Sequence, residues 1–158
     1  MNFLHEADMY DFFLKSDFVA KNFRSFSSEK IFFGQEIGSL FGIPDIIFTQ
    51  IDSEKILSII AIELKLSNWK RAFEQAFRYR SFANYSFVVL DNSMINPAKK
   101  NIDQFQKKNI GLLGLDNSGN IYDYYLPKNK KPYSEQLEAK LTEMVIKDKV
   151  FQEFSPCY

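Results

Sequence analysis

An acid and a lysine stand two residues apart near the end of a strongly apolar stretch. The stretch IIAIELKL, residues 59–66, places Glu63 and Lys65 among isoleucines and leucines. Burying a charged side chain without a partner costs roughly several kcal/mol, so a sequence rarely tolerates two such groups in a core strand. The sequence therefore predicts that these charges have a compensating role or lie where water reaches them.

A second acid lies on the apolar segment that comes before this stretch. Asp45 stands near the start of residues 43–51, and the polar turn IDSEK joins that segment to the next. A hairpin around the turn predicts a register that pairs Asp45 with Glu63 and Ile51 with Leu57. Because side chains alternate across a strand, one face of the second strand carries Leu57, Ile59, Ala61, Glu63 and Lys65. Asp45 and Glu63 are thus expected at the rim of one sheet.

Two carboxylates and a lysine at a sheet rim suit metal-assisted hydrolysis. Glu63 and Lys65 lie about 6.6 Å apart along the strand. Mg²⁺ prefers one or two carboxylates, a carbonyl and retained waters, which leaves room for a phosphate oxygen. A bound cation lowers the pKa of a coordinated water and stabilises charge on phosphorus. Lys65 is then placed to hold the hydroxide or to offset the developing negative charge.

The flanking segments predict the elements that position these groups. The spacing of an apolar stripe predicts an amphipathic opening helix with Glu6 at its margin; the stripe is Phe3, Ala7, Tyr10, Leu14 and Phe18. Residues 31–37, 43–51 and 55–66 predict three strands. Ser67 is a suitable N-cap for a helix whose apolar stripe is Trp69, Ala72, Phe73, Ala76 and Phe77.

The rest of the chain predicts two strand-crossing units and a final helix. Residues 85–90 and 110–115 form buried strands with a helix at 97–107 between them, and 121–126 returns in a hairpin as a possible edge strand. Leu137, Leu141, Met144 and Val145 mark the last helix. This order predicts an α/β fold in which helices cover both faces of a mixed sheet.

The motifs together resemble the PD-(D/E)XK, or restriction-endonuclease-like, nuclease superfamily. Pro44-Asp45 followed by Glu63-Leu64-Lys65 resembles its signature. Gln75 and Tyr79, one helical turn apart, resemble the QxxxY element of its exonuclease and repair branches. The segments EADMY at 6–10 and GLLGLDNSGNI resemble its first helix and its late hairpin, so the likeness covers residues 6 to about 126.

The resemblance implies a three-layer α/β/α fold and Mg²⁺-dependent hydrolysis of phosphodiester bonds, usually in DNA, with Mn²⁺ able to substitute. It assigns metal ligation to Asp45, Glu63 and the Leu64 carbonyl, water activation to Lys65, and positioning to Gln75 and Tyr79. Glu6 is a further metal ligand by the same likeness, and Glu36 competes with it for that role. The alternative is a non-catalytic module on the same fold that binds nucleic acid or a protein.

The bulk composition limits the class of protein. With 158 residues, 46% of them hydrophobic, we expect residues 1–158 to form one domain. The single cysteine, Cys157, excludes an internal disulfide, and the lack of a long apolar run or signal segment favours the cytoplasm. No Walker loop, zinc ligand set or nucleophile elbow is present, and the sole histidine, His5, makes no catalytic dyad. A homodimer or a partner subunit remains open.

Net charge is zero, so any nucleic-acid affinity depends on local clusters of cations. One cluster lies on the helix after Lys65, and its members are Lys70, Arg71, Arg78 and Arg80. The other clusters are Lys99, Lys100, Lys107 and Lys108, and then Lys128, Lys130 and Lys131. Such groups are usually solvated surface, and phosphate binding by them predicts a steep dependence on salt. Trp69 belongs to the apolar stripe and is expected in the core rather than as a platform for bases.

Overall fold

A computed structural model describes most of the chain, namely residues 1–22, 29–35, 42–52, 55–146 and 152–153. Glu36 lies outside these residues. Within the described ranges no helix is both long enough and apolar enough to cross a membrane.

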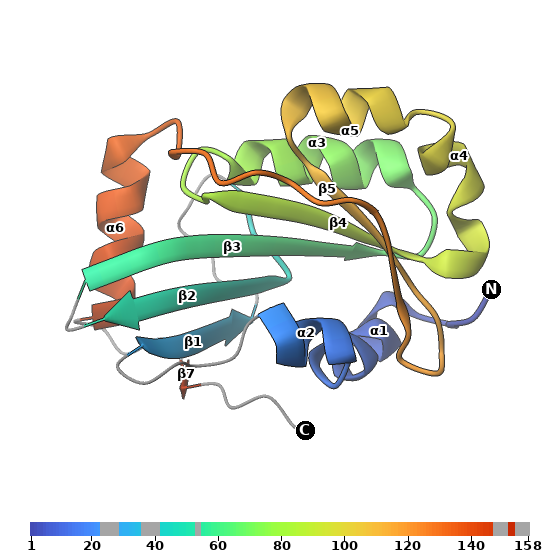
Figure 1. The fold of residues 1–158 in the computed structure, drawn as a ribbon, viewed down its shortest axis with the longest axis horizontal. Helices are drawn as coiled ribbons and strands as arrows, with labels where there is room; N and C mark the ends of the chain where they lie inside the picture. The colour runs from blue at the N-terminus through green and yellow to red at the C-terminus, as the bar shows by residue number, and fades with distance from the viewer. Residues whose placement is uncertain (23–28, 36–41, 53–54, 147–151, 154–158) are drawn as a thin grey trace.

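The described strands form one mixed sheet (Figure 1). The strands are β1 (Glu29–Gln35), β2 (Ile46–Asp52), β3 (Lys55–Lys65), β4 (Tyr85–Asp91), β5 (Gly111–Leu115), β6 (Ile121–Tyr125) and β7 (Gln152–Glu153). Their order across the sheet is β6-β5-β4-β3-β2-β1-β7, with β3, β4 and β5 parallel and the other pairs antiparallel. The expected α/β class with a mixed sheet is confirmed, and β6 is an edge strand.

Helices pack against the sheet from both sides. The helices are α1 (Glu6–Leu14), α2 (Asp17–Asn22), α3 (Trp69–Tyr79), α4 (Asn96–Lys99), α5 (Ile102–Lys108) and α6 (Glu135–Ile146), with a 3₁₀ turn at Asn92–Met94. One apolar cluster joins alternate residues of β2 to β5 with α3, α4, α5 and α6. A second cluster joins the intervening residues with α1 and α2. Figure 1 shows α3 to α5 on one side of the sheet and α1 and α2 on the other.

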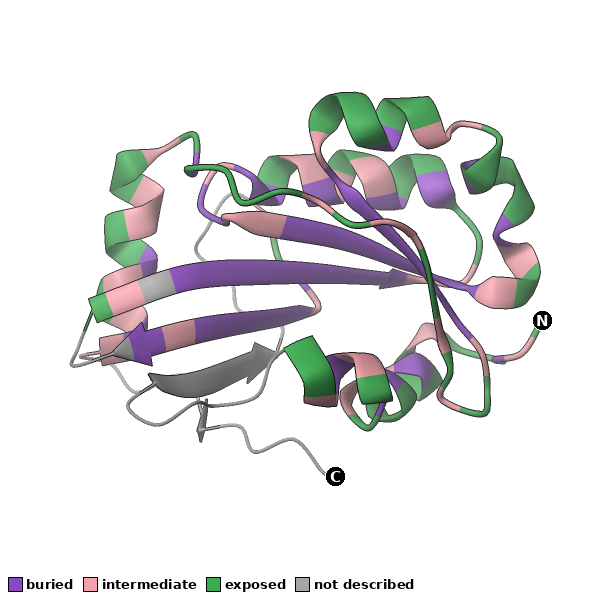
Figure 2. Cartoon of the chain, in the orientation of Figure 1, coloured by how far each residue is buried: buried purple, intermediate pink, exposed green. Residues whose placement is uncertain are grey.

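The central strands are buried over most of their length because both faces are covered. Every described residue of β4 and β5 except Tyr85 is buried, and so is β3 from Ser58 to Leu64 (Figure 2). Continuous burial explains the near-continuous apolar runs in these segments, which are typical of parallel strands. Glu63 is therefore an acidic residue in a part of β3 that is buried on both faces.

The β2–β3 hairpin has the predicted register where the candidate residues lie. Ile46 pairs with Ile62, and the same register continues to Gln50 and Ser58. Beyond that point a β-bulge shifts the pairing, so Ile51 faces Ile56 rather than Leu57 as predicted. The error falls at the turn end, because an extra residue in one strand changes the register only beyond the bulge.

Three predicted helical features differ in detail. The opening helix is two helices, because it is interrupted at Lys15–Ser16. Its fully buried residues are Met9, Phe13 and Val19, while Tyr10, Leu14 and Phe18 of the predicted stripe are partly buried against the same cluster. The predicted helix at 97–107 is likewise divided into α4 and α5. The cap of α3 is Asn68, whose side chain accepts the Arg71 amide at 3.3 Å, and not Ser67.

A buried carboxylate ties the amino-terminal segment to the carboxyl edge of the parallel strands. Asp91, at the end of β4, accepts the amides of Asn2 and Phe3 at 2.7 and 3.0 Å through Oδ2. Its Oδ1 accepts both the amide and the hydroxyl of Ser93. This clamp fixes the start of α1 beside the end of β3, and the charge of Asp91 is fully hydrogen-bonded there.

Candidate active site

Glu63 lies under α3, with Tyr79 as its hydrogen-bond partner. The carboxylate is only 3% exposed, and the Tyr79 hydroxyl lies 2.6 Å from its Oε2. Tyr79 comes from the last turn of α3, and its hydroxyl is also 2.9 Å from the carbonyl oxygen of Ile43. Gly42, at φ +98°, lets the chain pass close to this ring, because a Cβ there would stand 2.8 Å from Tyr79 Cε1. The predicted pair Glu63 and Tyr79 is therefore brought together directly.

Asp45 is held against the backbone of β3. Its amide donates to the carbonyl oxygen of Ile62 at 3.1 Å, and its Oδ2 accepts the amide of Leu64 at 2.7 Å. The Tyr10 hydroxyl from α1 approaches the other oxygen, Oδ1, at 3.3 Å. The side chain thus continues the β2–β3 ladder beyond its last regular pair. The amide of Leu64 therefore holds the Asp45 side chain against the residue that follows Glu63 in β3.

Burial makes ionisation costly for both carboxylates, and Asp45 adds to the cost for Glu63. Burial raises the pKa of Glu63 to about 8, and the nearby Asp45 is the next largest cause. Burial also raises the pKa of Asp45, against the lowering effect of the Leu64 amide. Lys65 favours the charged form of both acids and Glu6 disfavours it. Two crowded acids of this kind are stabilised when they share a proton or a cation.

Tyr79 contacts two acceptors but has one hydroxyl proton. When Glu63 is ionised, Tyr79 donates to it and the Ile43 carbonyl lacks this donor. When Glu63 is protonated, the acid donates to the Tyr79 oxygen and Tyr79 donates to Ile43, so both contacts are hydrogen bonds. Burial, with Glu63 as the next cause, raises the pKa of Tyr79 well above its usual value, so the phenol keeps its proton.

Lys65 and Glu6 form an ion pair at the open side of the site. Lys65 Nζ lies 3.5 Å from Glu6 Oε2, with side chains 17% and 44% exposed. Glu6 opens α1, which Asp91 holds in place. The structure therefore brings Glu6 to the site as the partner of Lys65, and it places the lysine at the solvent side of the two acids.

Gln75 lies one turn before Tyr79 but does not join the hydrogen-bond network among the described residues. Its Oε1 is buried and has no hydrogen-bond partner. Gln75 also lines a groove of about 440 Å³ along the outer side of α3. A buried acceptor without a donor is costly, so the Gln75 amide oxygen lowers the stability of the fold in this arrangement.

The residues present offer few protein ligands to a metal ion, and this small number suits a hydrated Mg²⁺ ion. Within the described part of the chain, no group of three or more His, Cys, Asp or Glu side chains gathers closely enough to hold a metal. Asp45 and Glu63 supply two carboxylates, which is the number that Mg²⁺ commonly takes while retaining waters. Burial is the main cause that raises the pKa values of both acids, and a bound cation would favour their ionised forms.

One predicted cation has a structural role instead. Arg80 is 1% exposed, and its guanidinium donates to the carbonyl oxygens of Ala83, Lys130 and Lys131. The centre of the Tyr133 ring lies 4.9 Å from Cζ of Arg80, and burial lowers the pKa of the Arg80 guanidinium. The expectation that Arg80 lies on the solvated side of α3 is wrong, because the loop before α6 folds over it.

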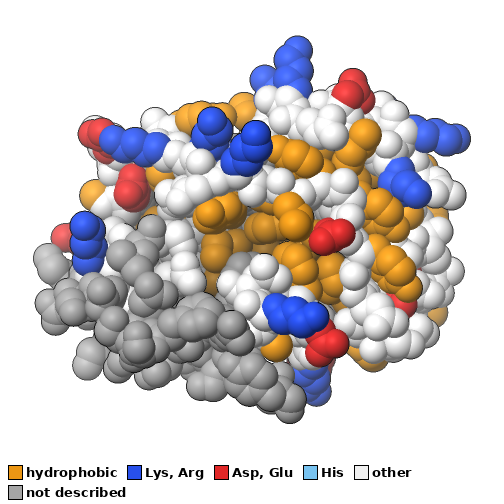
Figure 3. Space-filling model, in the orientation of Figure 1, with side chains coloured by type: hydrophobic (Ala, Val, Ile, Leu, Met, Phe, Trp, Pro, Cys, Tyr) orange, Lys and Arg blue, Asp and Glu red, His pale blue; other side chains and the backbone are white. Residues whose placement is uncertain are grey.

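On the face shown in Figure 3, Lys and Arg side chains are dispersed around a central group of hydrophobic ones. Lys99 lies over the Tyr124 ring and Lys108 over the Phe77 ring, at 5.1 and 5.2 Å. Trp69 is 8% exposed and packs in the core, as expected.

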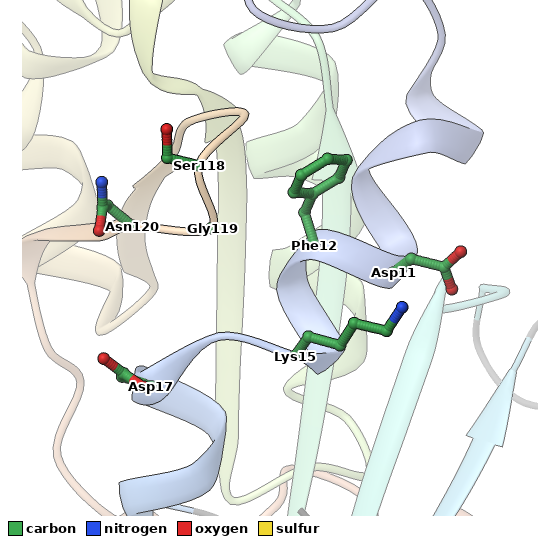
Figure 4. Close-up of a pocket in the computed structure, with 7 residues that line it drawn as sticks. All are labelled: Asp11, Phe12, Lys15, Asp17, Ser118, Gly119 and Asn120. Atoms are coloured by element: carbon green, nitrogen blue, oxygen red, sulfur yellow. The ribbon is translucent and has the colours of Figure 1, made fainter. Parts of the chain in front are cut away.

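A separate pocket lies on another side of α1 (Figure 4). It measures about 330 Å³ and is lined by Asp11, Phe12, Lys15, Asp17, Ser118, Gly119 and Asn120. The turn between β5 and β6 approaches α1 here, with the Gly119 position facing the Phe12 carbonyl. None of the predicted site residues lines this pocket, so it is distinct from the Asp45–Glu63 pair.

Two contributors to the site were missed in the sequence. Tyr10 belongs to the predicted apolar stripe, yet its hydroxyl reaches Asp45. Asp91 follows the apolar run YSFVVL, and an acid directly after a buried strand is a signal that could have indicated it.

Comparisons with protein-family models, with curated proteins and with solved structures gave no match to this chain.

Proposed function

We propose that this protein is a metal-dependent nuclease of the PD-(D/E)XK type, with a three-layer α/β/α restriction-endonuclease-like fold. The observation that supports it most is the hydrogen bond from the Leu64 amide to Asp45. This bond holds Asp45, the first acid of the motif, against the residue that follows Glu63, the second acid. DNA is the expected substrate, and a cytoplasmic location is part of the same proposal.

The residues have distinct roles in this reaction. Asp45 and Glu63 would hold a Mg²⁺ ion, with the Leu64 carbonyl as a further ligand. When bound, the ion supplies a water of lowered pKa and neutralises charge on the phosphate. Tyr79 donates to Glu63 and keeps its carboxylate oriented in the ionised state. Lys65 leaves Glu6 to contact the attacking water or a phosphate oxygen, at the exposed side of the site.

The Glu6–Lys65 ion pair supports a second candidate. A lysine already neutralised by a carboxylate, among described residues that bring no three metal-ligating side chains together, suits a non-catalytic module that binds nucleic acid or a protein on the same fold. Such a module would bind equally well in the presence of a chelator and would turn over no substrate.

Cleavage assays distinguish the two candidates. Purified protein is incubated with single-stranded, duplex and branched DNA in Mg²⁺ or Mn²⁺, beside Asp45→Asn and Lys65→Met. The exposed Lys55→Met, at the other end of β3, is the matched control. The nuclease proposal expects cutting by the wild type and by Lys55→Met alone. Cutting that survives Asp45→Asn and Lys65→Met, or no cutting with any metal, would overturn it.

A further inference from the structure

The groove between α3 and α5 has an aromatic wall and an amide wall. It measures about 660 Å³ and is lined by Trp69, Lys70, Phe73, Glu74, Asn101 and Gln104. Phe73 is half-buried and meets Phe105 edge to face, with ring centroids 5.0 Å apart. Across the groove, Gln104 donates from Nε2 to Asn101 Oδ1 at 3.3 Å, which leaves its Oε1 as an acceptor. These are the groups that bind a flat heterocycle with N–H donors on its edge.

A cationic groove lies alongside it on the same helix. That groove, of about 440 Å³, is lined by Asn68, Lys70, Arg71, Glu74, Gln75 and Arg78. Three cations face one carboxylate in it, and Lys70 and Glu74 line both grooves. Lys70 Nζ also lies 6.0 Å from the centre of the Trp69 ring. Phosphates are attracted to the cationic side, while the aromatic side accepts a ring.

The helix that lines both grooves, α3, also contacts the candidate active site through Tyr79. The helix α3 starts at Trp69, four residues after Lys65, so its first turn follows directly from the carboxyl end of β3. That first turn contains no acidic residue and carries Lys70 and Arg71. A strand whose scissile phosphate lay at Asp45 and Glu63 would therefore continue along this helix.

We propose that the α3–α5 groove holds an unpaired base of a single-stranded nucleic acid whose phosphates lie in the cationic groove of α3. The choice of ligand rests on the proposed nuclease function, and the inference names single strands as its substrate class. In a duplex the bases are stacked and paired, so none can turn into a groove between two helices without being flipped out.

The single tryptophan reports occupancy of this groove directly. The full-length protein is titrated in EDTA, so that no cleavage occurs, with a labelled oligothymidylate and with a blunt duplex of equal length. Trp69 fluorescence and the anisotropy of the label are both followed. We expect single strands to quench Trp69 and to bind at least about fivefold more tightly than the duplex, in line with base–aromatic stacking.

Two matched variants test the aromatic wall. Phe73→Leu keeps apolar volume against Phe105 but removes the ring, and it should weaken single-strand binding about fivefold. Phe77→Leu is the same change one turn later on α3, outside both grooves, and should leave binding unchanged. Equal affinity for duplex, or a Phe73→Leu variant that binds like Phe77→Leu, would overturn the inference. If single strands quench Trp69 fluorescence but are not cleaved in Mn²⁺, the nuclease proposal is refuted and the base-binding groove stands. If cleavage depends on Asp45 but single strands do not quench Trp69, the nuclease proposal stands and the groove is refuted.

Discussion

Replacing Glu63 by glutamine should remove a pH dependence of folding stability that the wild type shows. Burial and Asp45 raise the pKa of Glu63 to about 8, against an ordinary value of 4.5. Between these two values the folded state keeps a proton that the unfolded state has lost, so the free energy of unfolding falls as pH rises. Glutamine carries no titrating proton and can still accept from Tyr79, so this slope should disappear.

The size of the effect follows from the two pKa values. Each pH unit inside the window lowers the free energy of unfolding by about 1.4 kcal/mol. Over the whole window the ionisation of Glu63 costs on the order of 5 kcal/mol, which is a large part of the stability of an ordinary domain. Asp45, whose pKa is also raised, adds a slope of the same sign.

Urea unfolding followed by circular dichroism from pH 5 to pH 9 measures this slope in chelator. Glu74→Gln is the control, because Glu74 is an exposed acid on α3. The Glu74→Gln variant should keep the wild-type dependence of the free energy of unfolding on pH. The Glu63→Gln variant should show a weaker dependence and should be more stable than the wild type above pH 8. If Glu63→Gln retains the full slope, the carboxyl is not buried as described and the electrostatic reasoning fails.

Three further variants test other contacts. Tyr79→Phe removes the donor to Glu63 and should lower the free energy of unfolding by about 1–2 kcal/mol in urea titrations; no change would mean that this hydrogen bond is absent. Arg80→Met leaves buried carbonyl groups without a donor and should cost about 2–3 kcal/mol in the same assay, with oligonucleotide affinity unaltered; weaker binding at full stability would restore Arg80 as a phosphate ligand. Glu6→Gln breaks the partly buried ion pair with Lys65 and should change stability by about 1 kcal/mol or less, with Mn²⁺ affinity little changed in calorimetry; loss of Mn²⁺ binding would make Glu6 a metal ligand.

The sequence indicated the sheet and the principal site residues because these depend on local rules. Alternation along two apolar segments predicted the β2–β3 pairing as far as Gln50, and the stripe of α3 predicted which side of it packs on the sheet. The bulge beside Ile51 could not be predicted, since one extra residue in an apolar strand does not change the hydrophobic pattern clearly.

The remaining errors concern long-range contacts. Arg80 follows a regular helix and has the composition of a surface residue, so only the fold shows that the segment around Lys131 covers it. Tyr10 fits an apolar stripe equally well, and its hydroxyl bond to Asp45 depends on how α1 is docked. Docking in turn depends on Asp91, far away in the sequence, which holds the chain ahead of α1.

Calorimetric titration with Mn²⁺ at pH 7 tests the central claim that Asp45 and Glu63 share one ion. The wild type should bind one ion per chain and release a proton, because Glu63 is protonated at this pH and must ionise to coordinate. The measured heat should therefore vary with the ionisation enthalpy of the buffer, and Asp45→Asn and Glu63→Gln should each abolish it. No heat in the wild type, or equal heat in both variants, would contradict the shared site.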